Sequence, residues 1–407
     1  MRIDFKRERD IVIVGGGPAG ASAAYYLAKR GFDVTVLESK QMPRAKPCGD
    51  GIGPRGVLAL ENMGLGGWLK SSGAYRVERL RIVAPSGKSI TSIAEPSLFP
   101  VIYGYIINRD VFDLKLIDYA RGAGAEIIEN FSADNLIRNA HVVAGVTGFF
   151  NDQPQEVRAK LIIIADGSKG RLSRLFGPDL SRAQAVGLRA YATNISGIDD
   201  CANIYFTRRS PKGYGWIFPN GPTSANIGVG LLGLDNGSRG AAIRNAFSYF
   251  TSEQDLSPAS LRESVIDSRP AGSVMRMNFG LRPLRHSGLA FIGDAAGLVS
   301  PINGEGISHA IESGQILSEH LPDRLSGRDA IDRGLADYEK AMRKRFLSDF
   351  RWGRMFNRAF GNPEWLDRVV AKAQKDEYLR AILGGVLTNT VHPRELVRLK
   401  VLAKILF

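Results

Sequence analysis

Three glycines and one acid near the N-terminus have the spacing of a phosphate-binding turn. The segment from Asp10 to Glu38 reads DIVIVGGGPAGASAAYYLAKRGFDVTVLE. Glycines in this pattern let the backbone turn sharply, approach a pyrophosphate and pack a helix against a strand, and the helix start offers free N–H groups to the phosphates. Glu38 stands where a carboxylate accepts hydrogen bonds from a ribose hydroxyl. The segment therefore predicts a bound dinucleotide, and with it redox chemistry. The residues expected to contact the dinucleotide here are Gly15, Gly17, Pro18, Ala19, Gly20 and Glu38.

A second group of glycines and acids lies about 270 residues further along the chain. The segment from Gly288 to Gly314 reads GLAFIGDAAGLVSPINGEGISHAIESG and predicts a buried strand, a loop and a helix. An acid after a strand accepts hydrogen bonds from polyol hydroxyls, and a helix start stabilises negative charge on an aromatic carbonyl. Taken alone, a capped helix after a strand is the better explanation. When it is considered together with the first segment, the segment from Gly288 to Gly314 resembles the second half of an FAD site. The strand–Asp–Gly motif at Asp166 and Gly167 completes that pattern.

Apolar runs beside these loops predict the elements that position them. Alternating residues at 79–93 predict a hairpin, and the composition changes between 185 and 274 to that of a separate sheet-rich unit. Helices are expected to dominate after residue 305. Strands are expected at 11–14, 34–37, 125–137, 142–150, 161–165, 185–194, 202–206, 215–218, 225–232 and 289–292, and helices at 106–120 and near 240–251.

Composition narrows the class of protein. The chain has 407 residues, of which 44% are hydrophobic and 23% charged, so it can bury a full core and is not expected to be disordered. Two cysteines, Cys48 and Cys201, cannot form a disulfide framework, and the charged N-terminus lacks a signal-peptide pattern, so we expect a cytoplasmic protein. The five histidines form no ligand cluster, which predicts no metal. The net charge is +13, yet no nucleic-acid recognition module is present, so nucleic acid is not an expected partner.

The C-terminal region combines positive charge with large apolar side chains. Residues 341–360 carry six Lys/Arg, and residues 396–407 are apolar apart from three cations. Such helices either lie on an anionic bilayer surface or pack their apolar face on their own protein. The sequence leaves both open, and the first would place the protein on the inner face of the membrane. The interleaved apolar residues are Phe346, Phe350, Trp352, Met355, Phe356 and Phe360.

Three stretches together closely resemble the geranylgeranyl reductase family, which includes bacterial menaquinone reductases and is related to aromatic-hydroxylase-type flavoproteins. They are PRAKPCGDGIGPR at 43–55, YGWIFPNGPTSANIGVG at 214–230 and NGEG at 303–306. The likeness extends over about residues 10 to 320. It implies an α/β fold with a glutathione-reductase-like, FAD-binding Rossmann domain, an inserted antiparallel-sheet substrate domain and a helical C-terminal region. The implied FAD-binding domain comprises 1–75, 100–183 and 280–330, the substrate domain 76–99 and 184–279, and the helical region 331–407.

The resemblance also implies roles for individual residues. Cys48 lies in the loop that this family places near the flavin ring, where a thiol could supply or relay a proton, although a free cysteine is usually a small buried hydrophobe. Tyr214, Trp216 and Phe218 alternate along a strand and so share one face, which could line an apolar cavity over the flavin, although plain sheet core is commoner. The further FAD-binding residues implied are Arg44, Cys48, Gly49, Arg109, Asp166, Gly167, Gly293, Asp294, Gly304, Glu305, Gly306 and Ile307, and the substrate-binding residues implied are Tyr214, Trp216, Phe218 and Pro219.

The implied activity is reduction of isolated C=C bonds in a polyprenyl substrate, by hydride from flavin N5 and a proton to the neighbouring carbon. The substrate would be a geranylgeranyl compound or a menaquinone side chain, and the external electron donor NAD(P)H or a ferredoxin. An FAD-dependent monooxygenase of the aromatic-hydroxylase type is the alternative, distinguished by its need for oxygen. A flavin-bearing carrier of prenyl lipids is a third reading. A halogenase is disfavoured because the Trp-x-Trp-x-Ile-Pro signature is missing.

Overall fold

The first of two large sheets is built from the buried apolar runs of the sequence. The computed structural model describes residues 3–176, 184–208, 213–233, 239–252, 261–266 and 269–406. Four parallel pairings form the centre of this sheet, and the residues of its central strands that lie next to the cradle, such as those at 11–14 and 161–164, are apolar because they are buried. Val14 pairs with both Leu37 and Ile164, so the loops after three central strands open at the same edge. In sheet order the strands are β18 (Arg285–His286), β19 (Leu289–Phe291), β11 (Gln153–Ile164), β1 (Arg9–Val14), β2 (Val34–Leu37) and β8 (Glu126–Ile128).

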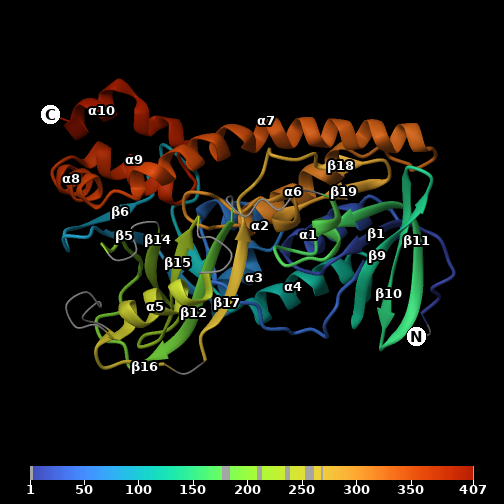
Figure 1. The fold of residues 1–407 in the computed structure, drawn as a ribbon, viewed down its shortest axis with the longest axis horizontal. Coiled ribbons are helices and arrows are strands. Elements are labelled where there is room, and N and C mark those ends of the chain that lie inside the picture. The colour runs from blue at the N-terminus through green and yellow to red at the C-terminus, as the bar shows by residue number, and fades with distance from the viewer. Residues whose placement is uncertain are drawn as a thin grey trace.

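Helices and small sheets complete this unit (Figure 1). Helix α1 packs against α6 and α4, and it approaches α6 closely because Gly314 lacks a side chain: a Cβ there would lie 2.5 Å from Ser22 Oγ. A long hairpin extends β11, and a three-stranded sheet lies between the two units. The elements are α1 (Pro18–Lys29), α2 (Pro54–Asn62), α3 (Gly66–Ser71), α4 (Arg109–Gly122), α6 (Ile307–His320), η1 (Leu172–Phe176), η4 (Gly293–Ala296), the hairpin β9 (Phe131–Asn139) and β10 (Val142–Phe150), and the small sheet β3 (Gly51–Ile52), β7 (Gly104–Ile106) and β4 (Tyr75–Val77).

The second sheet differs from the expectation in one pairing. All neighbours are antiparallel except β5 and β13, which run parallel, so the sheet is mixed. The parallel pair arises because the β5–β6 hairpin comes from a distant part of the chain and joins the edge of a meander. Phe247 and Phe250 of α5 (Arg239–Ser252) cover one face of the sheet. In order the strands are β16 (Val265–Ile266), β12 (Gln184–Thr193), β15 (Ala225–Leu232), β14 (Gly213–Pro219), β13 (Cys201–Tyr205), β5 (Arg79–Val83) and β6 (Ser89–Ile93), with β17 (Ala271–Arg276) also on β12.

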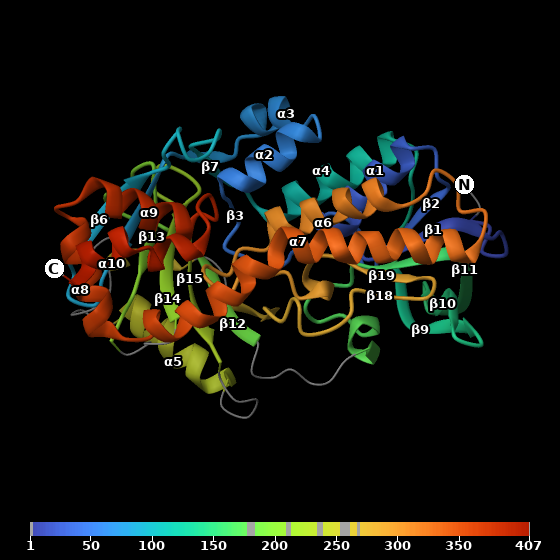
Figure 2. The same ribbon diagram turned by 90° about the horizontal axis from the view of Figure 1, so that it is seen from above.

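The C-terminal helices join the two units. Helix α7 runs along the length of the molecule (Figures 1 and 2), and near its start Tyr338 donates a 2.7 Å hydrogen bond to the carbonyl of Phe291 in the first sheet. The following helices pack apolar side chains such as Leu383 on Leu80 and Ile90 of the second sheet. This packing covers the part of the face opposite α5 that is formed by β5, β6 and β13. The elements are α7 (Arg328–Phe360), α8 (Pro363–Ala373), α9 (Glu377–Leu387), η5 (Pro393–Val397) and α10 (Leu399–Leu406).

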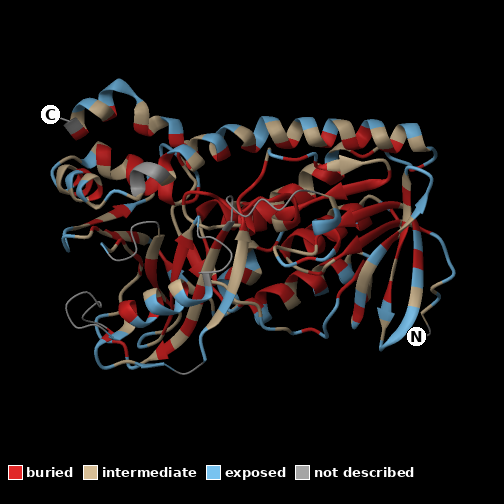
Figure 3. Ribbon diagram, viewed as in Figure 1, coloured by how far each residue is buried: buried red, intermediate tan, exposed pale blue. Residues whose placement is uncertain are grey.

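The interleaved aromatics of α7 face inward. Phe346, Phe350 and Phe356 are buried, whereas Met355 is 46% exposed, and Figure 3 shows buried and exposed positions alternating along this helix. The side chain of Phe360, and Phe407, lie outside the described residues. Among the helices that the structure describes, none combines the length and apolar character needed to cross a bilayer.

Two strands differ in extent from the sequence prediction. The strand expected over 125–137 is two strands, because Asn130 takes a left-handed conformation with φ of +58° between β8 and β9. The strand expected over 161–165 is the end of β11, which begins at Gln153. Its first half is polar and pairs with β10 at the surface, so no apolar run marks it in the sequence.

Candidate functional site

The glycine turn after β1 has the geometry of a phosphate cradle. Gly15 has φ of +106°, and a Cβ there would lie 2.4 Å from the carbonyl oxygen of Ala165. A Cβ on Gly20 would lie 1.8 Å from the carbonyl oxygen of Gly15, so both positions need glycine. Helix α1 starts at Gly17 without a side-chain cap, which leaves its first N–H groups available to an anion. At the end of β2, Glu38 is 4% exposed and accepts a 2.9 Å hydrogen bond from the N–H of Gly16. These residues fit a dinucleotide.

Loops after β11 and β19 meet beside this turn. Ser168 donates a 2.8 Å hydrogen bond to Asp294, which links the two loops. Asp166 accepts a 3.0 Å hydrogen bond from the N–H of Ser173, and its Oδ1 is buried with no partner among the described residues. Gly293 has φ of +58°, and a Cβ there would lie 2.6 Å from that of Ala19. Sequence segments far apart thus form one cradle, which fits FAD.

A buried ion cluster connects the cradle to the Cys48 loop. Arg109 is 5% exposed and donates two 2.8 Å hydrogen bonds to Asp113, one turn along α4. Arg44 bridges this cluster to the cradle, because its Nη1 lies 3.1 Å from Asp113 and its Nε 3.4 Å from Glu38. Sequence reasoning missed Asp113, although its i, i+4 spacing from Arg109 was the available signal.

At the start of α6, Glu305 acts as a helix cap. It accepts a 2.7 Å hydrogen bond from the N–H of Ser308, and His309 Nδ1 lies 3.3 Å from its Oε2. Burial by itself would raise the pKa of Glu305, but His309 and Ser308 outweigh it and lower the pKa to about 2. The carboxylate therefore stays ionised, while Gly304, Gly306 and Ile307 line the adjoining cavity.

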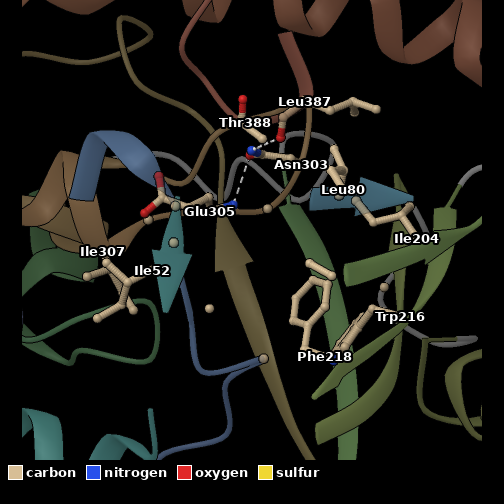
Figure 4. Close-up of a pocket in the computed structure, with 18 of the residues that line it drawn as sticks. Ile52, Leu80, Ile204, Trp216, Phe218, Asn303, Glu305, Ile307, Leu387 and Thr388 are labelled. Carbon is tan, nitrogen blue, oxygen red and sulfur yellow. Dashed lines mark hydrogen bonds between the residues drawn. The ribbon is translucent and has the colours of Figure 1, made fainter. Parts of the chain in front are cut away.

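A mostly apolar cavity lies between the cradle and the second sheet. Its volume open to the centre of a water molecule is about 250 Å³, and it has an opening to solvent. Cys48, Gly49 and Glu305 border it on the cradle side, and Leu80 and Leu387 on the other side. Figure 4 shows Trp216 and Phe218 side by side on the sheet, with Ile52 and Ile307 across the cavity. The space is a mostly apolar one that reaches from the Cys48 loop to α9.

The aromatic stripe on β14 lines this cavity because strand side chains alternate. The rings of Tyr214, Trp216 and Phe218 follow one another at 6.2 and 6.1 Å between centroids, on the cavity face. Pro219 is not among the cavity-lining residues; it lines a small pocket on the opposite face with Ile217, as the odd positions of the strand require. The prediction that Pro219 binds substrate therefore lacks geometric support.

The Gly-x-Gly part of the motif makes room for the indole. A Cβ on Gly228 would lie 2.2 Å from Trp216 Cζ2, and one on Gly49 would lie 3.3 Å from a ring carbon of Phe218. Trp216 Nε1 donates a 3.0 Å hydrogen bond to Asn226, which is fully buried. The aromatic and glycine residues of this motif thus form one packing unit in space.

Helix α9 supplies a cavity wall that sequence reasoning missed. Gly384, Leu387 and Thr388 line the cavity. Asn303 ties this wall to the NGEG loop, since its Nδ2 donates to the carbonyl of Leu387 at 2.8 Å and its Oδ1 accepts from the N–H of Glu305 at 3.1 Å (Figure 4). No motif in the last part of the chain pointed to this role.

Elsewhere, ligand atoms of Asp199, Asp200 and Cys201 lie within 4.8 Å of one another. Arg79 forms ion pairs with both Asp199 and Asp200, and Arg81 forms one with Asp199. The group is therefore explained as an ion-pair network, and Cys201 is fully buried.

Comparison with known proteins agrees with this geometry. Residues 8–348 match the FAD binding domain family. A menaquinone reductase of Mycobacterium tuberculosis is 33% identical over 77% of each chain, and a digeranylgeranylglycerophospholipid reductase of Methanococcoides burtonii is 30% identical over 84% of this chain and 81% of that protein. The crystal structure of a geranylgeranyl bacteriochlorophyll reductase-like protein from Thermoplasma acidophilum superposes with a TM-score of 0.82 at 24% identity, covering 96% of this chain and 98% of that one. A flavin-dependent brominase has the same fold, with a TM-score of 0.73, 19% identity, and coverage of 96% and 97%.

Proposed function

Because the chain belongs to the FAD-binding family of geranylgeranyl and menaquinone reductases, we propose that this FAD-dependent oxidoreductase saturates isolated C=C bonds of a polyprenyl substrate. The observation that carries the proposal is the mostly apolar cavity that is lined by residues from the Cys48 loop to α9. A prenyl chain is long, apolar and without hydrogen-bonding groups, so it matches such a lining. The names of the two curated relatives both describe substrates with prenyl chains.

The chain's own residues have three tasks in this reaction. The glycine turn, Glu38 and Asp294 would hold FAD, which when bound supplies the hydride for the reduction. Trp216 and Phe218 orient the prenyl chain and exclude water from the cavity. Cys48 holds a proton at the cavity's cradle side: burial raises the pKa of its thiol, so the thiol is protonated at neutral pH and available to the alkene carbon next to the one that accepts hydride.

The substrate class is a geranylgeranyl-type lipid or the side chain of a prenylated quinone such as menaquinone. NAD(P)H or a ferredoxin is the proposed external donor of electrons to FAD. Association with the inner surface of the membrane stays a prediction. Since Phe346, Phe350 and Phe356 of α7 are buried, the proposed lipid contact involves exposed residues of the C-terminal region, such as Lys344 and Leu399.

Product analysis with and without oxygen tests the reaction class. The protein with FAD is given a donor and a menaquinone, under nitrogen and in air, and the extracted lipid is analysed by mass spectrometry. A reductase adds two hydrogens per double bond under both gases. A product that forms only in air and contains an added oxygen would establish the monooxygenase alternative instead. Lipid that binds but never reoxidises the reduced FAD would identify a carrier.

A further inference from the structure

Cys48 interacts with a buried cation and a buried anion. The cation is Arg109, whose guanidinium interacts with the thiol and is held in place by Asp113. The anion is Asp50, two residues along the same loop, whose backbone N–H also interacts with the thiol. The two charges act in opposite directions on the thiol, since a nearby cation favours the thiolate and a nearby anion favours the thiol.

Asp50 is held by the second sheet. Its side chain is 0% exposed and its φ is +61°, a conformation that few non-glycine residues adopt. Oδ2 accepts hydrogen bonds from Tyr191 at 2.6 Å and from Asn226 Nδ2 at 2.8 Å, while Oδ1 is buried without a partner among the described residues. The carboxylate is therefore fixed beside Cys48.

Asn226 connects this carboxylate to both halves of the cavity. Its Nδ2 also donates to the carbonyl oxygen of Cys48 at 2.8 Å, and its Oδ1 accepts from Trp216 Nε1 at 3.0 Å. A single amide thus joins the cysteine loop, the buried acid and the aromatic stripe. The arrangement holds Cys48 at a set position relative to the cavity wall.

We propose that Asp50 and Arg109 are positioning residues that tune the acidity of the buried Cys48 thiol, with the Asp50 carboxylate opposing the Arg109 guanidinium. The inference rests on the proposed function, because that function is what gives the Cys48 proton its use as the proton delivered to the alkene. The electrostatic coupling itself requires no substrate.

The titration of Asp50 supports this arrangement. Burial raises the pKa of Asp50 to about 6, although Tyr191, Asn226, Arg109 and Arg189 each lower it. Above about pH 6 Asp50 is charged and favours the Cys48 thiol; below it Asp50 is neutral, and burial opposes the effect of Arg109 without the help of that charge. The other titratable groups facing the pair are Tyr191 and Arg189 on β12 and Tyr214 on β14.

The rate of thiol modification measures this coupling directly. The FAD-loaded protein is treated with methyl methanethiosulfonate between pH 5 and 9, and modification of each cysteine is followed by peptide mass spectrometry. Asp50→Asn should increase the rate at Cys48 by about tenfold at pH 7.5, because a neighbouring charge shifts a pKa by roughly one unit or more. Cys201 is an internal control whose rate should not change, since it is buried and Asp50 is not among the charged groups that act on its thiol.

Two further variants serve as a control for specificity and as a second test that does not depend on the folding of Asp50→Asn. Asp199→Asn, an equal change beside the other cysteine, should leave the Cys48 profile as in the wild type. Tyr191→Phe removes a donor that lowers the pKa of Asp50, so the inflection near pH 6 should move upward, and this result decides the matter if Asp50→Asn fails to fold. Superimposable Cys48 profiles in folded Asp50→Asn or Tyr191→Phe protein would overturn the inference. If the Cys48 profile shifts as expected but the wild-type protein reduces no prenyl lipid, the proposed function alone fails.

Discussion

Replacing Gly228 by alanine tests the packing that places Trp216 over the cavity. The new Cβ would lie 2.2 Å from Trp216 Cζ2 and 2.6 Å from the carbonyl oxygen of Leu188. Ordinary contact begins at 3.4 Å, so the indole would have to move by about 1.2 Å, and the carbonyl by about 0.8 Å. The carbonyl belongs to a neighbouring paired strand and cannot move freely. Overpacking of this kind costs about 1–3 kcal/mol of unfolding free energy.

Gly230 provides a matched control on the same strand. A Cβ there meets only Trp216 Cζ3, at 3.9 Å, so Gly230→Ala should change stability by no more than about 0.5 kcal/mol. Urea unfolding followed by tryptophan fluorescence compares the two variants. We expect Gly228→Ala to unfold at clearly lower urea and to reduce prenyl turnover while still binding FAD, because the cradle is built from other strands. Equal unfolding midpoints for the two variants would refute the packing argument.

Three other variants test separate parts of the site. Trp216→Ala should retain FAD, measured by absorbance, but lose turnover of long prenyl chains; normal long-chain turnover would show that the cavity assignment is wrong. Gly384→Ala places a Cβ 2.0 Å from Ser92 Oγ, so it should cost about 1–3 kcal/mol, most of which a second change, Ser92→Gly, restores in a double-mutant cycle; additive effects would contradict this contact. Glu305 has a lowered pKa, so its stabilisation is complete above about pH 4.5 and is lost as the pH falls through about 2. Acid unfolding of Glu305→Gln should therefore show a smaller loss of stability over that window than the wild type, and an identical loss would exclude this role.

The first βαβ unit was predictable because its signals are local. An apolar run, three glycines and the acid at Glu38 lie within one segment, and each is needed by the turn itself. The stripe from Tyr214 to Phe218 was equally readable, since strand periodicity alone puts alternate residues on one face. The same periodicity argued against grouping Pro219 with them, and the structure shows that it faces away.

The partners that complete the site come from distant segments and carry no local signal. Asn226 contacts both Cys48 and Asp50, some 176 to 178 residues earlier in the chain. Helix α9 shows the amphipathic pattern of any packed helix, and only its docking on β6 makes Leu387 a cavity residue. A periodic pattern indicates which face is buried but not what buries it.

Anaerobic single turnover tests the central claim most directly. The FAD-loaded protein is reduced under nitrogen and mixed with a long-chain menaquinone or geranylgeranyl lipid, while flavin absorbance is followed and the lipid is then analysed by mass spectrometry. We expect the flavin to reoxidise and one prenyl double bond to be saturated for each flavin. A flavin that stays reduced in the presence of both lipids, with their side chains unchanged, would contradict the account.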